Sequence, residues 1–388
     1  MNFQHIEHIN DILPYIKDEK SILVMNKVAP NGHPYTVIDY VVVTDSTFGG
    51  DGPRLECRGI AFDGISGKII RRPLHKFFNY GEKLGVHQFI DLSRRHFLLP
   101  KLDGSMIAPM VVGDMIYWGT RAGVTDIGER VSEWVTYGET NQADYIGFAI
   151  DVIYIGYTPI FEYIGPDNRI VLRYEKRNLI LTQMRDMISG AYLTYDQMCY
   201  FADRYSIPVN RPLEASHASM DSIVEYVKPL QGEEGLVVWT NYDFIKIKAD
   251  EYLKIHRAKD TLQFEKNVLK VVLSGQEDDL IAVLPPEDAR AVRAYADAVN
   301  RSILGVSQQL QLWVDLHAKG KSRKDIALEI LGGGMKKFSP VLFKMLDGKA
   351  PMATMTDYLL TFTSSENKVE QIRDYITAKW HSIILEDA

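Results

Sequence analysis

Apolar and polar residues alternate over the first two thirds of the chain, in short runs rich in β-branched and aromatic residues. Turns that contain glycine, such as Asp63-Gly64, separate several of these runs, which is typical of short strands. Helices are expected only at Asp126–Tyr137 and Thr194–Tyr205, so strands and helices do not alternate and the pattern favours an α+β fold with mostly antiparallel sheets. Strands are expected at Tyr35–Val43, Arg54–Asp63, Phe97–Leu102, Met106–Val112, Asp114–Thr120, Thr158–Ile164, Ile170–Tyr174, Leu179–Met184, Glu234–Thr240 and Phe244–Lys248.

Near His256, the spacing of the apolar residues changes from that of strands to that of helices. Apolar residues recur at helical spacing over 261–275, and Pro285-Pro286-Glu287-Asp288 opens a helix that is expected to run to about His317. Ser322 is a candidate N-cap for a helix that ends before three glycines at 332–334. Further helices are expected at 338–346, 351–362 and 366–383. The sequence therefore predicts two domains, an α+β domain at 1–255 and an all-helical domain at 256–388.

Charge is distributed unevenly between these domains. The 388 residues carry a net charge of −7, and residues 1–255, with 26 basic and 33 acidic side chains, hold all of the excess. This acidic balance argues against a protein whose whole surface is basic and coats nucleic acid. It favours a local basic pocket suited to a nucleotide. Two cysteines argue against a disulfide framework, Met1–Asn10 does not resemble a signal peptide, and no apolar run approaches the ~20 residues of a membrane span. We therefore expect a cytoplasmic protein with no membrane partner.

The candidate chemistry begins at Lys101-Leu102-Asp103-Gly104-Ser105, directly after an apolar run. A lysine at the end of a buried strand can act as a nucleophile, and in an extended chain Asp103 would point to the same side as Lys101. Alone, this short motif also fits a solvated lysine. Five further segments add charged or aromatic residues to it: Glu56–Gly59, Arg72–Asn79, Phe161–Leu172, Glu234-Gly235 and Phe244–Lys248. In the last, alternation places Lys246 and Lys248 on one face.

Taken in this order, the motifs E-C-R-G, R-P-x-x-K-F-F-N, K-x-D-G-S, F-E-Y-I-G-P-D-N-R-I-V-L, E-G and F-x-K-I-K resemble those of the bacteriophage RNA ligase 1 family. This family belongs to the covalent nucleotidyltransferases, and the resemblance spans most of residues 54–250. It implies that Lys101 is the nucleophile that receives AMP, and that Glu162, Glu234, Lys246 and Lys248 share in catalysis. The nucleotide contacts that it implies are Tyr40, Arg58, Lys76, Phe78, Lys101, Arg121, Glu162, Lys246 and Lys248. Phe78 would stack near the adenine, and Arg121 stands where the related phage enzyme has lysine.

The resemblance also implies the cofactors and partners. ATP would donate AMP, and Mg²⁺ or Mn²⁺ would be held by Glu234, with a second cation near Gly275 and Asp278. The protein would join the 5′-phosphate and 3′-hydroxyl ends of RNA, with nicked tRNA as its substrate. It would act as a monomer and have no membrane partner. No P-loop motif is present, so a separate polynucleotide kinase-phosphatase is expected to prepare the ends. The cations near Lys101 would favour its uncharged, nucleophilic form.

Three alternatives stay open. Another polynucleotide ligase, active on single-stranded DNA, would share these motifs, as would a capping enzyme that uses GTP. DNA ligases and capping enzymes usually continue into a small β-barrel, whereas this chain becomes helical after Lys248. A non-catalytic RNA-binding protein on the same scaffold would not need Lys101, both glutamates and the two later lysines together. The basic residues Lys319, Lys321, Arg323, Lys324, Lys336 and Lys337 are candidates for RNA phosphate contacts in the helical domain.

Overall fold

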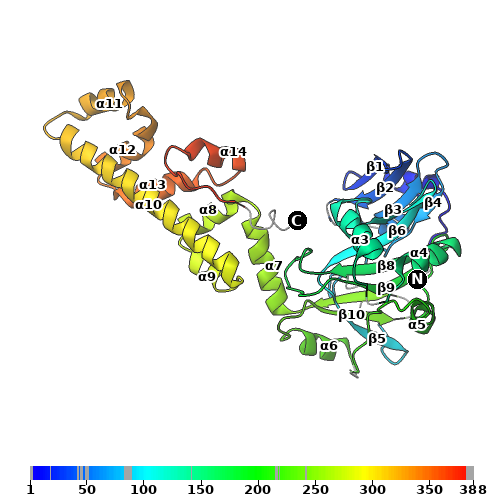
Figure 1. Cartoon of the computed structure of the whole chain (residues 1–388). Coiled ribbons are helices and arrows are strands. Elements are labelled where there is room, and N and C mark those ends of the chain that lie inside the picture. The colour runs from blue at the N-terminus through cyan, green and yellow to red at the C-terminus, as the bar shows by residue number, and fades with distance from the viewer. Residues whose placement is uncertain are drawn as a thin grey trace. The chain divides into compact units, whose positions relative to one another are not determined.

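The computed structural model describes residues 3–17, 19–41, 43, 47–48, 52–82, 90–140, 142–214, 217, 219–240 and 243–381. The chain divides into two compact units, Met1–Leu253 and Lys254–Ala388, two residues from the boundary expected at 255/256. The first unit contains antiparallel sheets and helices, and the second is helical (Figure 1). The predicted α+β class is therefore confirmed.

The described part of the first unit contains three sheets, and every pairing between their neighbouring strands is antiparallel. Their strand orders are β1-β2-β3-β4, β11-β10-β5 and β7-β6-β8-β9. The strands are β1 (Ile22–Val28), β2 (Pro34–Tyr40), β3 (Arg58–Asp63), β4 (Ile69–Arg71), β5 (His96–Pro100), β6 (Ser105–Val112), β7 (Met115–Gly119), β8 (Tyr157–Ile164), β9 (Asn178–Asp186), β10 (Gly235–Thr240) and β11 (Phe244–Lys248).

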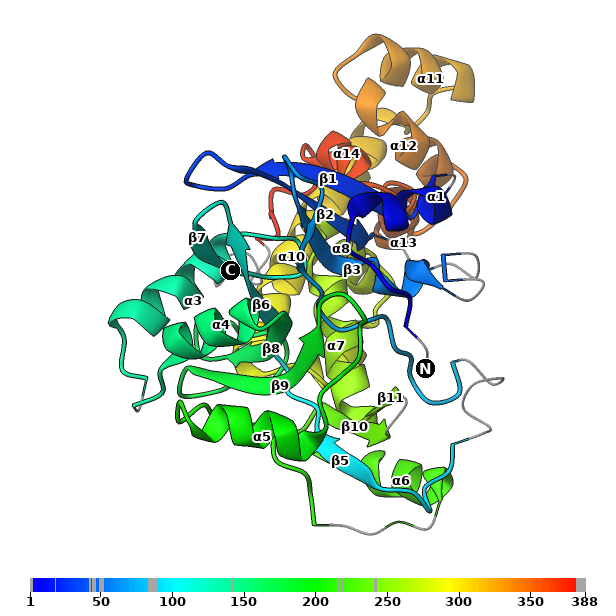
Figure 2. The same cartoon turned by 90° about the vertical axis from the view of Figure 1, so that its right-hand side faces the viewer.

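Helices cover the sheets of this unit, as Figure 2 shows. α3 packs on β7, α4 on β8, α5 on β9 and α6 on β11. Between them lies a core of large side chains that includes Trp118, Phe148 and Phe161. Among the described residues of the first unit, the helices are α1 (Leu13–Ile16), α3 (Asp126–Tyr137), α4 (Tyr145–Tyr154), α5 (Tyr195–Asp203) and α6 (Met220–Val227), with short 3₁₀ turns η1 (Ile9–Asp11) and η2 (Pro53–Glu56).

The second unit is built around the long helix α10 (Pro286–His317), whose apolar face includes Val292, Val299 and Ile303. This face packs with α12 and α13 in one apolar core, because its residues recur at the helical period. The other helical elements are α7 (Asp250–Leu262), which spans the boundary of the two units, α8 (Glu265–Leu273), α9 (Glu277–Ile281), α11 (Arg323–Gly332), η3 (Lys336–Phe338), α12 (Ser339–Leu346), α13 (Pro351–Leu360), α14 (Glu366–Val369) and η4 (Glu370–Ile372). No helix in the described part of the chain is both long and apolar enough to cross a membrane.

One predicted strand, Ile170–Tyr174, is wrong. The segment consists of bends and irregular backbone, because its backbone N–H groups donate to a side chain and not to a neighbouring strand. The backbone N–H groups of Val171 and Leu172 donate to Oδ2 of Asp103, at 2.8 and 2.6 Å, instead of to a neighbouring strand. The pattern of apolar residues alone does not reveal a carboxylate partner that lies far away in sequence.

Two other predicted elements are shorter than expected. The start of the strand at Arg54–Asp63 is the 3₁₀ turn η2, and β3 begins at Arg58. The single helix expected over 366–383 ends early, as α14 and η4, and turns follow to about 375. Val42 and residues 382–383, which belonged to predicted elements, lie outside the described residues.

Candidate active site

The β11-β10-β5 sheet brings three of the predicted site residues to one edge. Pro100, at the end of β5, pairs with Leu236, and Lys248, at the end of β11, pairs with Gly235. Because both neighbours run antiparallel to β10, their last residues lie beside the first two residues of β10. Lys101 and Glu234 extend this edge, and the Lys101 backbone N–H donates to the Gly235 carbonyl at 2.8 Å. The pairing of the strands therefore places Lys101, Glu234 and Lys248 together.

Glu234 is an acceptor shared by two lysines. Its Oε1 lies 2.7 Å from Nζ of Lys101 and 3.1 Å from Nζ of Lys248. The Glu234 side chain is 3% exposed, whereas the two lysine side chains are 21% and 24% exposed. Both ammonium groups are therefore held against a buried carboxylate and stay accessible to a ligand.

Glycine at position 235 is required for this arrangement. The backbone there has φ +139°, and a Cβ atom would lie 2.1 Å from the Ile247 carbonyl oxygen and 2.8 Å from Lys248 Cα. Any larger residue would push β11 away from β10. The glycine that follows Glu234 in the motif thus lets the strand with the two lysines approach closely.

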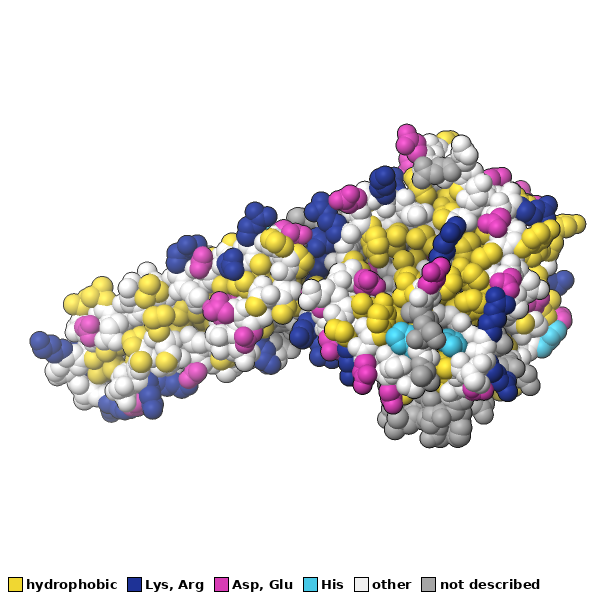
Figure 3. Space-filling model, turned by 90° about the horizontal axis from the view of Figure 1, so that it is seen from below, with side chains coloured by type: hydrophobic (Ala, Val, Ile, Leu, Met, Phe, Trp, Pro, Cys, Tyr) yellow, Lys and Arg dark blue, Asp and Glu magenta, His cyan; other side chains and the backbone are white. Residues whose placement is uncertain are grey.

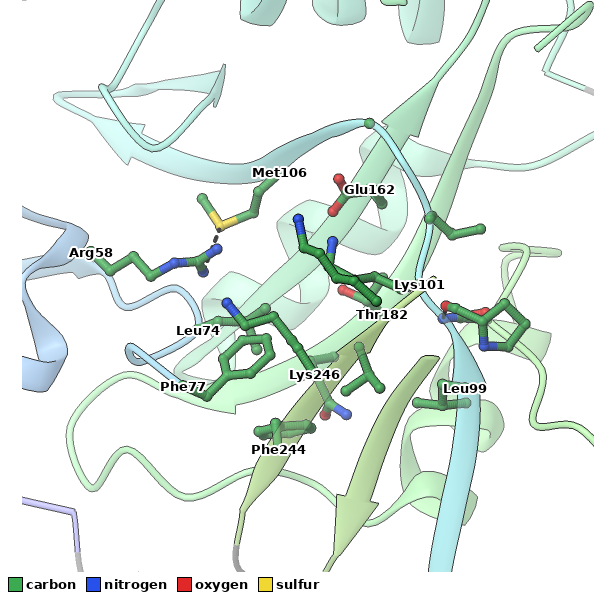
Figure 4. Close-up of a pocket in the computed structure, with 17 residues that line it drawn as sticks. Arg58, Leu74, Phe77, Leu99, Lys101, Met106, Glu162, Thr182, Phe244 and Lys246 are labelled. Carbon is green, nitrogen blue, oxygen red and sulfur yellow. Dashed lines mark hydrogen bonds between the residues drawn. The ribbon is translucent and has the colours of Figure 1, made fainter. Parts of the chain in front are cut away.

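A pocket lies beside these lysines, with a volume of about 270 Å³. Figure 4 shows Lys101, Lys246 and Arg58 directed toward one space near Glu162, while Phe77, Phe244 and Leu99 lie on the side away from Glu162. One end of the pocket is therefore charged and the other is apolar. The residues that line it are Arg58, Leu74, Phe77, Leu99, Pro100, Lys101, Leu102, Gly104, Met106, Glu162, Thr182, Gln183, Asn210, Val237, Phe244, Lys246 and Lys248.

The electrostatics of the charged end shift two groups toward neutrality. Burial lowers the pKa of Lys246 to about 7, and the positive charges of Arg58 and Lys76 act in the same direction. Burial raises the pKa of Glu162 to about 7, against the opposing effect of Lys101. Both groups can thus change charge near neutral pH, as is common where a site binds or transfers charged groups.

Four predicted nucleotide contacts form a group that is separate from the pocket lining. The Lys76 ammonium lies over three aromatic rings, those of Tyr40, Phe48 and Phe78, at 5.4, 5.6 and 5.2 Å from their centroids. The Arg121 guanidinium lies 4.5 Å from the Tyr40 centroid, and its Nε donates to Asp39 at 2.8 Å. Burial raises the pKa of Asp39 to about 6 although Arg121 opposes the shift. The structure thus gathers Tyr40, Lys76, Phe78 and Arg121 with one another.

Of the two adjacent phenylalanines, Phe77 lines the pocket, whereas Phe78, which the resemblance implied, is not among the lining residues. Phe77 is 8% exposed, and the Lys246 ammonium lies 4.7 Å from its ring centroid, with the Arg58 guanidinium at 5.8 Å. Successive side chains of an extended segment point to opposite sides, so only one of the two phenylalanines can face the pocket. Stacking of Phe78 on the adenine stays a prediction.

Asp103 has its own set of buried partners, and the expectation that it shares a side with Lys101 stays a prediction. The segment after Pro100 is irregular and not an extended strand. Asp103 is 2% exposed, and its carboxylate accepts from two backbone N–H groups of 171–172 and from the Tyr252 hydroxyl at 2.7 Å. Its role is to anchor the loop that carries Lys101.

The predicted metal ligands lie in different units. Glu234 belongs to the first unit, whereas Gly275 and Asp278 belong to the second. Gly275, with φ +63°, follows α8 and ends it, and Asp278 is exposed in the first turn of α9. Within the described residues no three His, Cys, Asp or Glu side chains gather as a metal site. A cation here would therefore need further oxygen ligands, and the second metal site stays a prediction.

Sequence reasoning missed a buried ionic cluster next to the site. Glu56 accepts from both Arg72 and Arg185, whose side chains are completely buried, at 2.7 to 3.3 Å. Burial alone would raise the pKa of Glu56, but the two arginines outweigh it and hold the pKa at about 2. Arg72 is the first residue of the segment that carries Lys76 and Phe77. Its contacts in this cluster therefore fix the course of that segment. The signal in the sequence was the pair Glu56 and Arg72 within two of the motifs.

The two shifted groups lead to a prediction on pH. Glu162 gains its charge as the pH rises through about 7, whereas Lys246 loses its charge over the same range. If both act in their charged forms, kcat/KM for the reaction at this site should peak near pH 7. Rates measured from about pH 5.5 to 9 should lose the acid limb in Glu162→Gln. They should lose the alkaline limb in Lys246→Arg, because arginine stays charged. Unchanged limbs in both variants would contradict the assignment.

The amino-acid sequence of this chain is similar to that of known proteins. A model of the RNA ligase family matches residues 56–253. A protein of Thermovibrio ammonificans assigned as an RNA ligase is 28% identical over 273 residues, which cover 66% of this chain and 68% of that protein. RNA ligase 1 of bacteriophage TS2126 is 24% identical over 297 residues, 70% of this chain and 71% of the phage protein.

A third relative combines two activities in its name. This protein of Autographa californica nuclear polyhedrosis virus, assigned as a bifunctional polynucleotide kinase/RNA ligase, is 25% identical over 291 residues. The match covers 69% of this chain but 40% of the viral protein. The matched family region contains every predicted site residue from Arg58 to Lys248, and the predicted resemblance is confirmed. The chain belongs to the RNA ligase family.

Proposed function

We propose that this chain is an ATP-dependent RNA ligase that joins a 5′-phosphate end to a 3′-hydroxyl end through two adenylated intermediates. One observation carries the proposal: the accessible Lys101 amine lies 2.7 Å from Glu234 at the mouth of a pocket with Lys246, Lys248 and Arg58. A nucleophile, a carboxylate and several cations around one cavity are what phosphoryl transfer to an amine requires. The family relationship supports the same reaction.

The first step would form lysyl-AMP. The Lys101 Nζ attacks the α-phosphorus of ATP, the bond to the bridging oxygen breaks, and pyrophosphate leaves while the amine gives up its protons to solvent. Lys246, Lys248 and Arg58 oppose the negative charge that develops on the phosphate oxygens. An oxygen of the RNA 5′-phosphate then attacks the same phosphorus and releases Lys101. Finally, the 3′-hydroxyl attacks the 5′-phosphorus of the RNA, and AMP leaves.

The residues present fit a divalent cation. Mg²⁺ prefers oxygen ligands and is commonly held by one or two carboxylates together with substrate phosphates. Glu234 and Glu162 supply such carboxylates. Glu234 contacts the Lys101 ammonium, and Lys101 acts electrostatically on Glu162. When bound, Mg²⁺ would neutralise phosphate charge, and the displacement of Lys101 and Lys248 from Glu234 would free the amine.

A joining assay tests the proposal. The full-length protein is incubated with an RNA that carries a 5′-phosphate and a 3′-hydroxyl, with Mg²⁺ and with or without ATP. We expect joined or circular RNA only with ATP, and none from an RNA with a 5′-hydroxyl. A parallel single-stranded DNA substrate separates RNA ligation from general polynucleotide ligation. Absence of joining on every RNA end, or joining that needs no nucleotide, would refute the function.

The natural substrate that we propose is a structured RNA such as nicked tRNA, recognised in part by the helical unit. On the face seen in Figure 3, basic side chains of this unit are interspersed with acidic ones. Half of the predicted basic cluster is engaged in ion pairs, Lys321 with Glu329, Arg323 with Asp347 and Lys337 with Asp374. The exposed Lys319, Lys324 and Lys336 have no ion pair among the described residues, so they are the better candidates for phosphate contacts.

These three lysines yield a prediction. Replacing Lys319, Lys324 and Lys336 together with alanine should weaken sealing of a nicked stem-loop RNA. Because each phosphate contact releases counterions, the slope of log affinity against log salt should fall by roughly 2 to 3. Filter binding over a salt series measures the slope, and self-adenylation serves as the internal control, since it should not change. An unaltered slope would assign RNA recognition to other residues.

The expected partners follow from the same reaction. The ends must carry a 5′-phosphate and a 3′-hydroxyl, so a polynucleotide kinase-phosphatase would act before this protein. The assigned name of the baculovirus relative, which pairs a kinase with a ligase, supports this order. We further propose that the protein acts as a monomer in a reducing cytoplasm, in line with its two free cysteines.

A further inference from the structure

Gln183 is a buried amide without a partner in the protein. Its side chain is 2% exposed, and neither Oε1 nor Nε2 makes a hydrogen bond within the described part of the chain. Nearly all buried polar groups in folded proteins are hydrogen-bonded, because an unpaired donor or acceptor is costly. Gln183 lines the pocket beside Lys101. A donor and an acceptor are thus offered to whatever occupies the pocket.

A β-bulge directs this side chain. Ile160 of β8 pairs with Gln183, but the next residue, Phe161, pairs with Leu181, so Thr182 is an extra residue in β9. The Thr182 hydroxyl donates to the Ile160 carbonyl at 2.9 Å. Neighbouring side chains of a regular strand face opposite sides, whereas Thr182 and Gln183 both line the pocket. Bulges commonly redirect side chains near functional sites, and this one brings the amide to the pocket.

The surroundings of Gln183 suit a flat heterocycle. Besides its charged residues, the pocket is lined by five apolar side chains, those of Leu74, Phe77, Leu99, Val237 and Phe244. Such walls hold a ring by its faces and leave its edge to hydrogen-bonding groups. The amide offers an acceptor next to a donor. Adenine has a donor, its N6 amino group, next to a ring-nitrogen acceptor, and paired contacts of this kind are how Gln recognises adenine.

We propose that Gln183 recognises the adenine of ATP, with Oε1 accepting from the N6 amino group and Nε2 donating to the adjacent ring nitrogen. The assignment rests on the proposed use of ATP. It places the base against the apolar lining residues and directs the phosphates toward Lys101, Lys246 and Arg58, so that Phe77, and not Phe78, would lie beside the base. Gln183 is therefore a base-recognition residue that touches the nucleotide but none of the reacting atoms.

The test combines a protein change with a nucleotide change. Self-adenylation is measured for wild type and Gln183→Leu, with ATP and with purine riboside triphosphate, which lacks the N6 amino group. For wild type, kcat/KM should fall roughly 10- to 100-fold when this group is removed. Gln183→Leu should show a similar loss with ATP and little further loss with the analogue, because the contact is already absent. Gln231→Leu, an exposed glutamine of the same unit, is the matched control and should behave as wild type.

Each outcome decides. Wild type that uses both nucleotides equally, or losses that simply multiply in Gln183→Leu, would overturn the role of Gln183 while leaving the ligase function in place. No labelling of wild type by any nucleotide would overturn the proposed function together with this assignment. If Gln183→Leu is misfolded by circular dichroism, Gln183→Met replaces it, since methionine has similar length and adapts to irregular gaps. The wild-type comparison decides the matter independently of either variant.

Discussion

Lys101→Ala is expected to abolish covalent labelling of the protein by ATP, with a loss on the order of 10⁴-fold or more. Alanine removes the nitrogen that would form the phosphoramidate, and neither Lys246 nor Lys248 replaces it, since each projects from β11 and not from the end of β5. Lys101→Arg should show the same loss while keeping a positive charge beside Glu234. Labelling is followed with ATP that carries a radioactive α-phosphate. Lys228→Ala changes an exposed lysine outside the pocket and should label normally.

The same variant separates the steps of the reaction. The final step transfers no group to Lys101, so Lys101→Ala should still join an RNA whose 5′ end is already adenylated, without added ATP. Joining of this RNA by the variant, together with its failure on 5′-phosphate RNA, would locate the defect in the first step. Labelling that survives in both Lys101→Ala and Lys101→Arg would disprove the role of Lys101.

Glu234→Gln is the second change with a large expected effect. Glu234 contacts both Lys101 and Lys248 and is 3% exposed. Its loss would leave two ammonium groups close together without the carboxylate that lies between them, and would remove a predicted metal ligand. We expect self-adenylation to fall roughly 10²- to 10³-fold, the usual effect of losing one charged or hydrogen-bonding group that stabilises a transition state.

The neighbouring residue offers a matched control for this prediction. Glu233→Gln removes an exposed carboxylate one position away and should leave the adenylation rate unchanged. Glu234→Asp keeps the charge on a shorter side chain and should recover part of the activity. A thermal unfolding curve for each variant separates lost catalysis from lost structure. Equal rates for Glu234→Gln and Glu233→Gln would contradict the role of Glu234.

Much of the fold could be predicted, because the spacing of apolar residues and the positions of turn residues indicate where helices and strands lie. α3 was predicted with the bounds Asp126–Tyr137, and β11 with the bounds Phe244–Lys248. α4 was missed since its sequence is almost wholly apolar, and periodicity cannot distinguish such a run from a strand. β1 was missed because several of its apolar residues are exposed, so it lacks an alternating pattern.

The candidate site was predicted residue by residue from motifs, but its geometry was not. Motifs indicate which residues matter, whereas the register of β10 with its neighbours decides that Lys101, Glu234 and Lys248 meet. The buried role of Asp103 depends on partners near 171 and at Tyr252, which no local pattern relates to it. Gln183 also escaped notice, because a single extra residue in a strand leaves no mark in the pattern of apolar positions.

The central claim is that the Lys101 amine becomes covalently bonded to AMP. Wild-type protein is incubated with ATP and Mg²⁺, digested with a protease under conditions that preserve a phosphoramidate, and examined by mass spectrometry. We predict an AMP group on the peptide that contains Lys101, attached to its Nζ. AMP on any other residue, such as Lys246 or Lys248, or no adduct in protein that joins RNA with ATP, would contradict the account.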